Sequence, residues 1–286
     1  MTLSLSGKEI ISLVFSEVSV RAEHSDGTTK IIKIQKGLKI LDCSNNQLIT
    51  LKGLPEGLKE LDCSNNRLAS LDSLPKGLEK LDCSQNFFIN LENLPKGLKF
   101  LNCSFSWLTR LENLPEGLKI LDCSGHHLNS LTKFPETLEK LVCRNGSLVC
   151  LKNLPKGLKT LRCQYNNLIS LEGLPPGLKR LVCYSNQLTM LNDLPKELFD
   201  LRCYNNPLEY IEPSSPLTSF IFPPHFSRFQ EHYHSRHREW NSLKGCQAEM
   251  LTMLAKNGVS FASLEILSDE FAIHLKISIQ KYQSVS

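Results

Sequence analysis

Cysteine is the residue type in this sequence with the widest chemical repertoire, and it recurs at a fixed interval. The chain holds 11 cysteines in 286 residues, and nine of them lie 20 residues apart. A thiol can close a disulfide, ligate a metal ion or act as a nucleophile. The periodic thiols are Cys43, Cys63, Cys83, Cys103, Cys123, Cys143, Cys163, Cys183 and Cys203.

The spacing argues against each of these reactive roles. Nine is an odd number, and parallel side chains in register do not offer the dihedral geometry that a disulfide requires. Pairs of the C-x-x-C kind, which are typical of zinc sites, are absent from the sequence. Free cysteine often serves as a small buried hydrophobe. We therefore interpret the periodic cysteines as core residues that bind no metal, in a protein that works in a reducing compartment.

The remaining residues with catalytic or metal-binding potential form no complete motif. "EHYHSRHREW" places His234 and His237 on one helical face with Glu231 one turn earlier, but H-E-x-x-H is missing. Neither G-x-S-x-G, a glycine-rich phosphate loop nor a Cys/His nucleophile pair is recognisable. We expect no enzyme and no cofactor. An active site within residues 213–286 is the alternative, and the small size of that segment argues against it.

A repeat positions the cysteines. "LDCSNNRLASLDSLPKGLEK" ends at Lys80 and restarts at Leu81, and the unit reads L-x-x-L-x-C-x-x-N-x-L-x-x-L-x-x-L-P-x-G. This is the leucine-rich-repeat pattern with cysteine in the third leucine position. Alternation along a short strand directs Leu61 and Cys63 inward and Asp62 outward. The predicted fold is an α/β solenoid: a curved leucine-rich-repeat stack with a parallel β-sheet on its concave face and helical or hairpin caps.

The asparagine of each unit has a separate role. Its amide can hydrogen-bond backbone groups where the chain leaves the strand. It is present in six units, at Asn46, Asn66, Asn86, Asn166, Asn186 and Asn206. Three consecutive units carry Ser106, His126 and Gly146 instead. A 20-residue unit leaves too few residues for an outer helix, so we expect extended or single-turn 3₁₀ backbone there.

Three domains follow from these patterns. Residues 1–37 form an N-terminal cap, in which a capping box at Ser6 and Glu9 predicts a short helix and Asp26-Gly27 predicts a hairpin. Residues 38–212 form eight full repeats and a truncated ninth. Residues 213–286 begin with a Pro/Ser linker-like stretch and form a mostly helical C-terminal cap. Terminal repeats need such covers.

Bulk properties restrict the function further. The formal charge of +4 gives no global preference for nucleic acid or anionic membranes. No stretch approaches the ~18 apolar residues of a membrane span. Lys8 and Glu9 interrupt the segment where a secretory signal would be apolar. We expect a soluble monomer that is exported, if at all, without a cleaved N-terminal signal.

The L-P-x-G-L-x-x-L-x-C-S-x-N-x-L units resemble the short bacterial leucine-rich repeats of secreted pathogen effectors, the group that includes YopM, IpaH and SspH proteins. The cysteine version also resembles repeats of type IV secreted effectors of intracellular bacteria. The resemblance covers residues 38–211 and implies delivery by a specialised system into the host-cell cytosol. IpaH-like proteins add a ubiquitin-ligase domain with a C-x-D motif. Here Cys246 is followed by Gln247 and Ala248, so that activity is not expected.

The outward positions of the strands change character along the stack. One column reads Asp42, Asp62, Asp82, Asn102, Asp122, Val142, Arg162, Val182, Arg202. The next reads Ser44, Ser64, Ser84, Ser104, Ser124, Arg144, Gln164, Tyr184, Tyr204. The face is therefore acidic and uniform at first, then basic and aromatic. Drift after duplication, with solvated charges, is the alternative to a binding surface.

Exposed aromatic clusters and arginines are typical anchors of protein interfaces. The predicted partner-binding residues are Phe87, Phe100, Phe105, Trp107, His127, Arg144, Arg162, Tyr165, Arg180, Tyr184, Arg202 and Tyr204. The alternative for the aromatic residues is that their rings pack against the loops. The first predicted partner is a host protein. RNA or a ribonucleoprotein is the second, because arginine and aromatic rings suit single strands.

Overall fold

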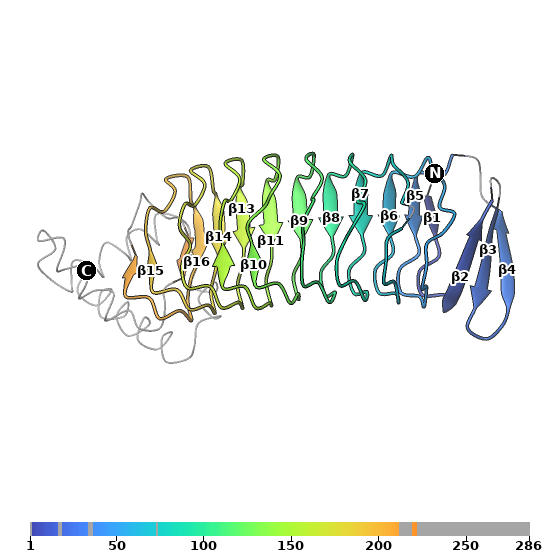
Figure 1. Ribbon diagram of the computed structural model, residues 1–286, viewed down its shortest axis with the longest axis horizontal. Coiled ribbons are helices and arrows are strands. Elements are labelled where there is room, and N and C mark those ends of the chain that lie inside the picture. Colours follow the sequence, from blue (N-terminus) through green and yellow to red (C-terminus); the bar gives the residue numbers. More distant parts are fainter. Residues whose placement is uncertain (1, 17–18, 34–36, 73, 212–218, 222–286) are drawn as a thin grey trace, which may run out of the picture.

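The computed structural model describes residues 2–16, 19–33, 37–72, 74–211 and 219–221, and these form a solenoid of stacked coils (Figure 1). One long face carries an 11-stranded parallel sheet. Its strands, in spatial order, are β1 (Thr2–Ser4), β5 (Ile40–Asp42), β6 (Glu60–Asp62), β7 (Lys80–Asp82), β8 (Phe100–Asn102), β9 (Ile120–Asp122), β11 (Lys140–Val142), β13 (Thr160–Arg162), β14 (Arg180–Val182), β16 (Asp200–Arg202) and β18 (Ser219–Ile221). From β5 to β16 each strand pairs with the residues 20 positions away. The predicted stack is confirmed.

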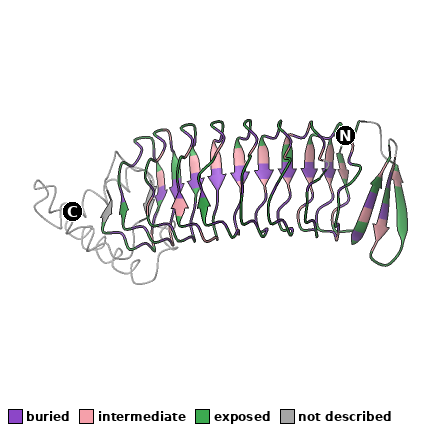
Figure 2. Ribbon diagram, viewed as in Figure 1, coloured by how far each residue is buried: buried purple, intermediate pink, exposed green. Residues whose placement is uncertain are grey.

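The leucine and cysteine columns form one continuous core (Figure 2). In the second unit Leu58, Cys63 and Leu68 are fully buried, and the other units repeat this. Each buried leucine stabilises the fold by roughly 1.5–3 kcal/mol. The nine periodic cysteines are free thiols at most 1% exposed, and burial raises the pKa of Cys163 to about 12. The predicted burial of these cysteines in the core is therefore confirmed.

The outer side of the stack is built from turns and short extended pieces. The amide of Leu58 donates to the Pro55 carbonyl at 3.1 Å, and the same turn recurs at each later Leu-Pro pair. Two small parallel sheets also lie on this side. One pairs β10 (Ser130–Leu131) with β12 (Cys150–Leu151), and the other pairs β15 (Met190–Leu191) with β17 (Tyr210–Ile211). The described residues contain no helix, so within them the solenoid consists of strands and turns.

The N-terminal segment forms an antiparallel sheet of β2 (Ile10–Phe15), β3 (Ser19–His24) and β4 (Thr29–Lys33). The predicted hairpin is confirmed, with Gly27 at φ 82°. The predicted helix is wrong, because Glu9 adopts φ 53°, which a helix cannot contain. Instead the amide of Ile10 donates to Oδ1 of Asn46 at 3.0 Å, which attaches β2 to the first repeat.

The predicted C-terminal cap is mostly outside the described residues. The exception is β18, which lies in the stretch interpreted as a linker and pairs with β16 in parallel. The helices expected after it, with Phe226, Phe229, Tyr233 and Trp240 on one face, and the histidine group of His232, His234 and His237 lie outside the described residues.

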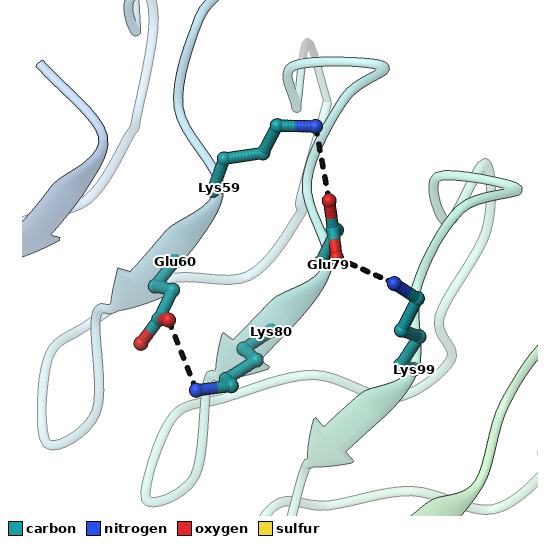
Figure 3. Close-up of polar contacts among 5 residues, drawn as sticks. All are labelled: Lys59, Glu60, Glu79, Lys80 and Lys99. Atoms are coloured by element: carbon teal, nitrogen blue, oxygen red, sulfur yellow. Dashed lines mark hydrogen bonds and ion pairs between the residues drawn. The ribbon is translucent and has the colours of Figure 1, made fainter.

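Charged side chains stabilise the edge where the strands begin. The carboxylate of Glu79 lies 3.0 Å from Lys59 Nζ and 2.6 Å from Lys99 Nζ, and Lys80 pairs with Glu60 at 2.9 Å (Figure 3). These contacts hydrogen-bond the charged form and lower the pKa of Glu79 to about 2. Because the pairs are exposed, each adds little to stability. They link neighbouring units at the surface of the stack.

Candidate partner-binding surface

An asparagine ladder shapes the turn that follows each strand. In the second unit Nδ2 of Asn66 donates to the carbonyls of Cys43 and Cys63 at 3.0 and 3.1 Å, and Oδ1 accepts from the amide of Leu48 at 2.9 Å. Asn86, Asn186 and Asn206 repeat the pattern. One side chain thus satisfies backbone groups of two successive units, as the sequence suggested.

The ladder is interrupted in three central units, and two of the replacements compensate each other. In a complete ladder the residue at 146 would accept from the amide of Leu128; here Nδ1 of His126 accepts that bond at 3.1 Å. Gly146 provides the space for this ring, since a Cβ at position 146 would overlap Cε1 of His126 at 2.3 Å. Burial lowers the pKa of His126 to about 4, so its ring is neutral at pH 7. The hydroxyl of Ser106 is buried and has no hydrogen-bond partner within the described chain.

Aromatic side chains project from the turns at the start of this interruption and from the unit before it. Phe87, Phe105 and Trp107 are 53%, 49% and 59% exposed, so about half of each side chain is open to solvent. The rings of Trp107 and His127 stack with centroids 5.6 Å apart. Ile89 is as exposed as its neighbours and extends the cluster. We call Phe87, Ile89, Phe105, Trp107 and His127 the aromatic edge.

Sequence reasoning missed Ile89, although a signal was present. Its column also holds Ile49, Val149 and Ile169, which are all exposed. Apolar residues at a position that alternates with buried leucine should have indicated an outward-facing apolar column.

A second cluster lies on the last units of the sheet. The rings of Tyr184 and Tyr204 stack at 4.3 Å with an interplanar angle of 9°, and Tyr165 meets Tyr184 edge-on at 5.1 Å. Burial is the main cause that raises the pKa of Tyr204 to about 12. The three rings therefore form one contiguous aromatic cluster on the last units.

The arginines around the tyrosines differ in whether their guanidinium groups contact another side chain. Arg202 Nε lies 3.2 Å from Asp200, and the guanidinium of Arg180 lies 5.3 Å from the centre of the Phe199 ring. Arg144 and Arg162 are exposed and have no hydrogen-bonded or ion-paired side-chain partner among the described residues. These two guanidinium groups are the ones available to a partner.

The acidic columns of the first units are satisfied internally. Oδ1 of Asp62 accepts from the amide and the hydroxyl of Ser64 at 3.0 and 2.6 Å, and four units share this turn. Ser84 and Ser124 are consequently buried, although the strand alternation predicted outward-facing serines. The first half of the sheet thus presents carboxylates that are already half hydrogen-bonded.

The structure divides the predicted site residues into groups. Phe87, Phe105, Trp107 and His127 lie in the aromatic edge. The last four units carry the three predicted tyrosines and the four predicted arginines. Phe100 belongs to neither group, because it is half-buried at the start of β8, where it pairs in register with Ile120.

Comparison with known proteins agrees with the fold. The family model described as "Leucine Rich repeats (2 copies)" matches residues 56–96. YopM from Yersinia pestis is 31% identical with a TM-score of 0.54, over 61% of this chain and 56% of that one. YopM from Yersinia enterocolitica is 29% identical with a TM-score of 0.52, over 67% and 54%. No curated protein sequence matches significantly.

The functional domain of InlJ from Listeria monocytogenes, whose description includes a cysteine ladder, is 27% identical with a TM-score of 0.55, over 67% of this chain and 48% of that one. The chain spans about half the length of these solved structures. It is thus a leucine-rich-repeat solenoid similar to bacterial repeat proteins. Within the described residues, no helix is long and apolar enough to cross a membrane.

Proposed function

We propose that this protein is a non-enzymatic bacterial effector that enters host cells through a specialised secretion system and binds a host protein. The binding surface combines the aromatic edge with the arginines and tyrosines of the last four units. The C-terminal segment 213–286 would cap the solenoid. The similarity to YopM, described as a leucine-rich effector protein, supports the effector role.

One observation carries the binding proposal. Four large apolar side chains of the aromatic edge are about half exposed or more, while Phe88 and Leu108, which directly follow Phe87 and Trp107, are fully buried. Contiguous exposed aromatic groups of this kind mark interaction sites. Binding would modulate the partner by occlusion or scaffolding. The free thiols of the core are compatible with the reducing cytosol of a host cell.

Affinity capture from host-cell lysate tests the proposal. The full chain is compared with a Trp107→Ala/Arg162→Glu variant and with a control, Lys152→Glu/Ile169→Ala, which changes exposed residues outside the predicted surface. We expect a protein that the wild type and the control retain and the site variant loses. A partner retained by all three chains would show that the surface is wrong.

Nuclease treatment of the lysate separates RNA binding from protein binding. The rings of Tyr184 and Tyr204 stack on each other, so the two ring faces in contact are closed to bases, and this favours a protein partner. Capture that disappears with nuclease and falls steeply with salt would favour RNA.

A further inference from the structure

The sheet face reverses its charge once along the stack. We define this face as the three outward positions of each unit, residues 60, 62 and 64 in the second. Over β5 to β9 it carries five acids and one lysine, and over β11 to β16 it carries five cations and one acid. The first group is Asp42, Glu60, Asp62, Asp82, Asp122 and Lys80. The second is Lys140, Arg144, Arg162, Arg180, Arg202 and Asp200.

The fold fixes this pattern in space. Successive strands lie about 4.8 Å apart, so the nine strands from β5 to β16 extend about 40 Å. The charge reverses within one step, between β9 and β11. In each half the minority charge is partly neutralised, because Lys80 pairs with Glu60 and Asp200 with Arg202. Lysines at the edge where strands begin occur in both halves, and Lys59 and Lys99 are engaged by Glu79.

We propose that the sheet face binds an extended protein segment of mixed charge, with its acidic stretch over β11–β16 and its basic stretch over β5–β9. This inference rests on the proposed function and adds the chemistry and orientation of the partner. Complementary potentials fix the register of a complex, because the reversed orientation places like charges together.

A uniformly charged polymer does not fit such a face. A nucleic acid strand that follows the cations of β11–β16 would meet Asp122, Asp82 and Asp62 as soon as it extends beyond them. The basic stretch covers only about 15 Å, which accommodates a few nucleotides. Charge reversal therefore favours a protein, whose side chains can change sign within one segment.

Fluorescence anisotropy with designed peptides tests this. The face accommodates about 12 extended residues, so the probe is a peptide of six glutamates followed by six lysines. An alternating Glu-Lys peptide of the same composition is the matched control, and a uridylate oligonucleotide of equal length is the polyanion. At low salt we expect the block peptide to bind the full chain about tenfold more tightly than the alternating peptide.

Two variants locate the ends of the peptide. Arg144→Glu/Arg162→Glu should weaken block-peptide binding about tenfold. Asp62→Asn/Asp122→Asn removes charge but keeps the turn, since Oδ1 of Asn102 already accepts from the Ser104 amide at 3.2 Å. It should weaken block-peptide binding about threefold and strengthen uridylate binding. A photoreactive group at the glutamate end should label β11–β16.

Equal affinity for block and alternating peptides, labelling spread over both halves, or tighter binding of uridylate would overturn the inference. Host-protein capture that still depends on Trp107 and Arg162 would then leave the proposed function intact. If the wild type captures no host protein, or if capture does not depend on Trp107 and Arg162, the proposed function is wrong, whatever the peptide measurements show.

Discussion

The units with a ladder asparagine and the three central units bury the same leucines and cysteines but satisfy their turns differently. Asn66 and Asn186 each bond backbone groups of two units, whereas His126 bonds one amide and Ser106 bonds none within the described residues. The core is continuous through both kinds of unit, with Cys103, Cys123 and Cys143 as buried as the rest. The stack therefore tolerates a loss of turn bonds where its core is intact, and Phe105, Trp107 and His127 of the aromatic edge lie in two of the units that lose them.

We expect the largest change in the free energy of unfolding when a ladder asparagine is replaced. Asn66→Ala should lower the free energy of unfolding by about 3 kcal/mol, because the carbonyls of Cys43 and Cys63 and the amide of Leu48 lose a buried partner. Ser106→Ala should cost less than about 0.5 kcal/mol, since its hydroxyl has no partner to lose. Denaturant titration measures both. Equal losses would mean that the ladder contributes no more than the interruption.

The second effect is a dependence on pH at His126. Its folded pKa of about 4 lies below the ordinary value of 6.5, so the unfolded chain binds the proton more readily. Stability should fall as pH drops from about 6.5 to about 4, by up to about 3 kcal/mol, and this contribution changes no further below pH 4. The contribution of His126 is measured by comparing the melting temperatures of the wild type and His126→Asn at pH 7 and at pH 4.5. An identical loss in both proteins would exclude His126 as the cause.

The third effect tests the compensation between His126 and Gly146. Gly146→Ala should destabilise by about 1–3 kcal/mol, because the added methyl overlaps the His126 ring. Gly97→Ala is the control, since its Cβ would meet its nearest atom at 3.7 Å. In a His126→Asn background the cost at Gly146 should shrink. Thermal unfolding of the four variants shows whether the two sites are coupled.

The smallest expected change is at the aromatic edge. Trp107→Ala should alter the free energy of unfolding by less than about 0.5 kcal/mol, since the side chain is 59% exposed. Loss of partner capture by this variant would then reflect a lost contact. A large drop in unfolding free energy would instead assign the ring a structural role.

Periodicity in the sequence predicts the stack, its core columns and the asparagine turns, because each depends on residues within one unit or 20 positions away. The helix at residues 10–15 was predicted wrongly, because a capping box and an apolar run are local signals, whereas Asn46 holds Ile10 in a strand. The exchange between His126 and Gly146 was not foreseen. It requires knowing that position 146 serves the amide of Leu128.

Thiol alkylation of the folded protein, resolved by peptide mass spectrometry, tests most directly that the core runs unbroken through the interruption. The nine periodic cysteines are at most 1% exposed, and Cys150 is half-buried outside their column. Among the ten cysteines of the described residues, Cys150 should react first, while Cys103, Cys123 and Cys143 stay protected as long as Cys63 and Cys183, until the chain unfolds. Labelling of the three central thiols at the rate of Cys150 would contradict a continuous core.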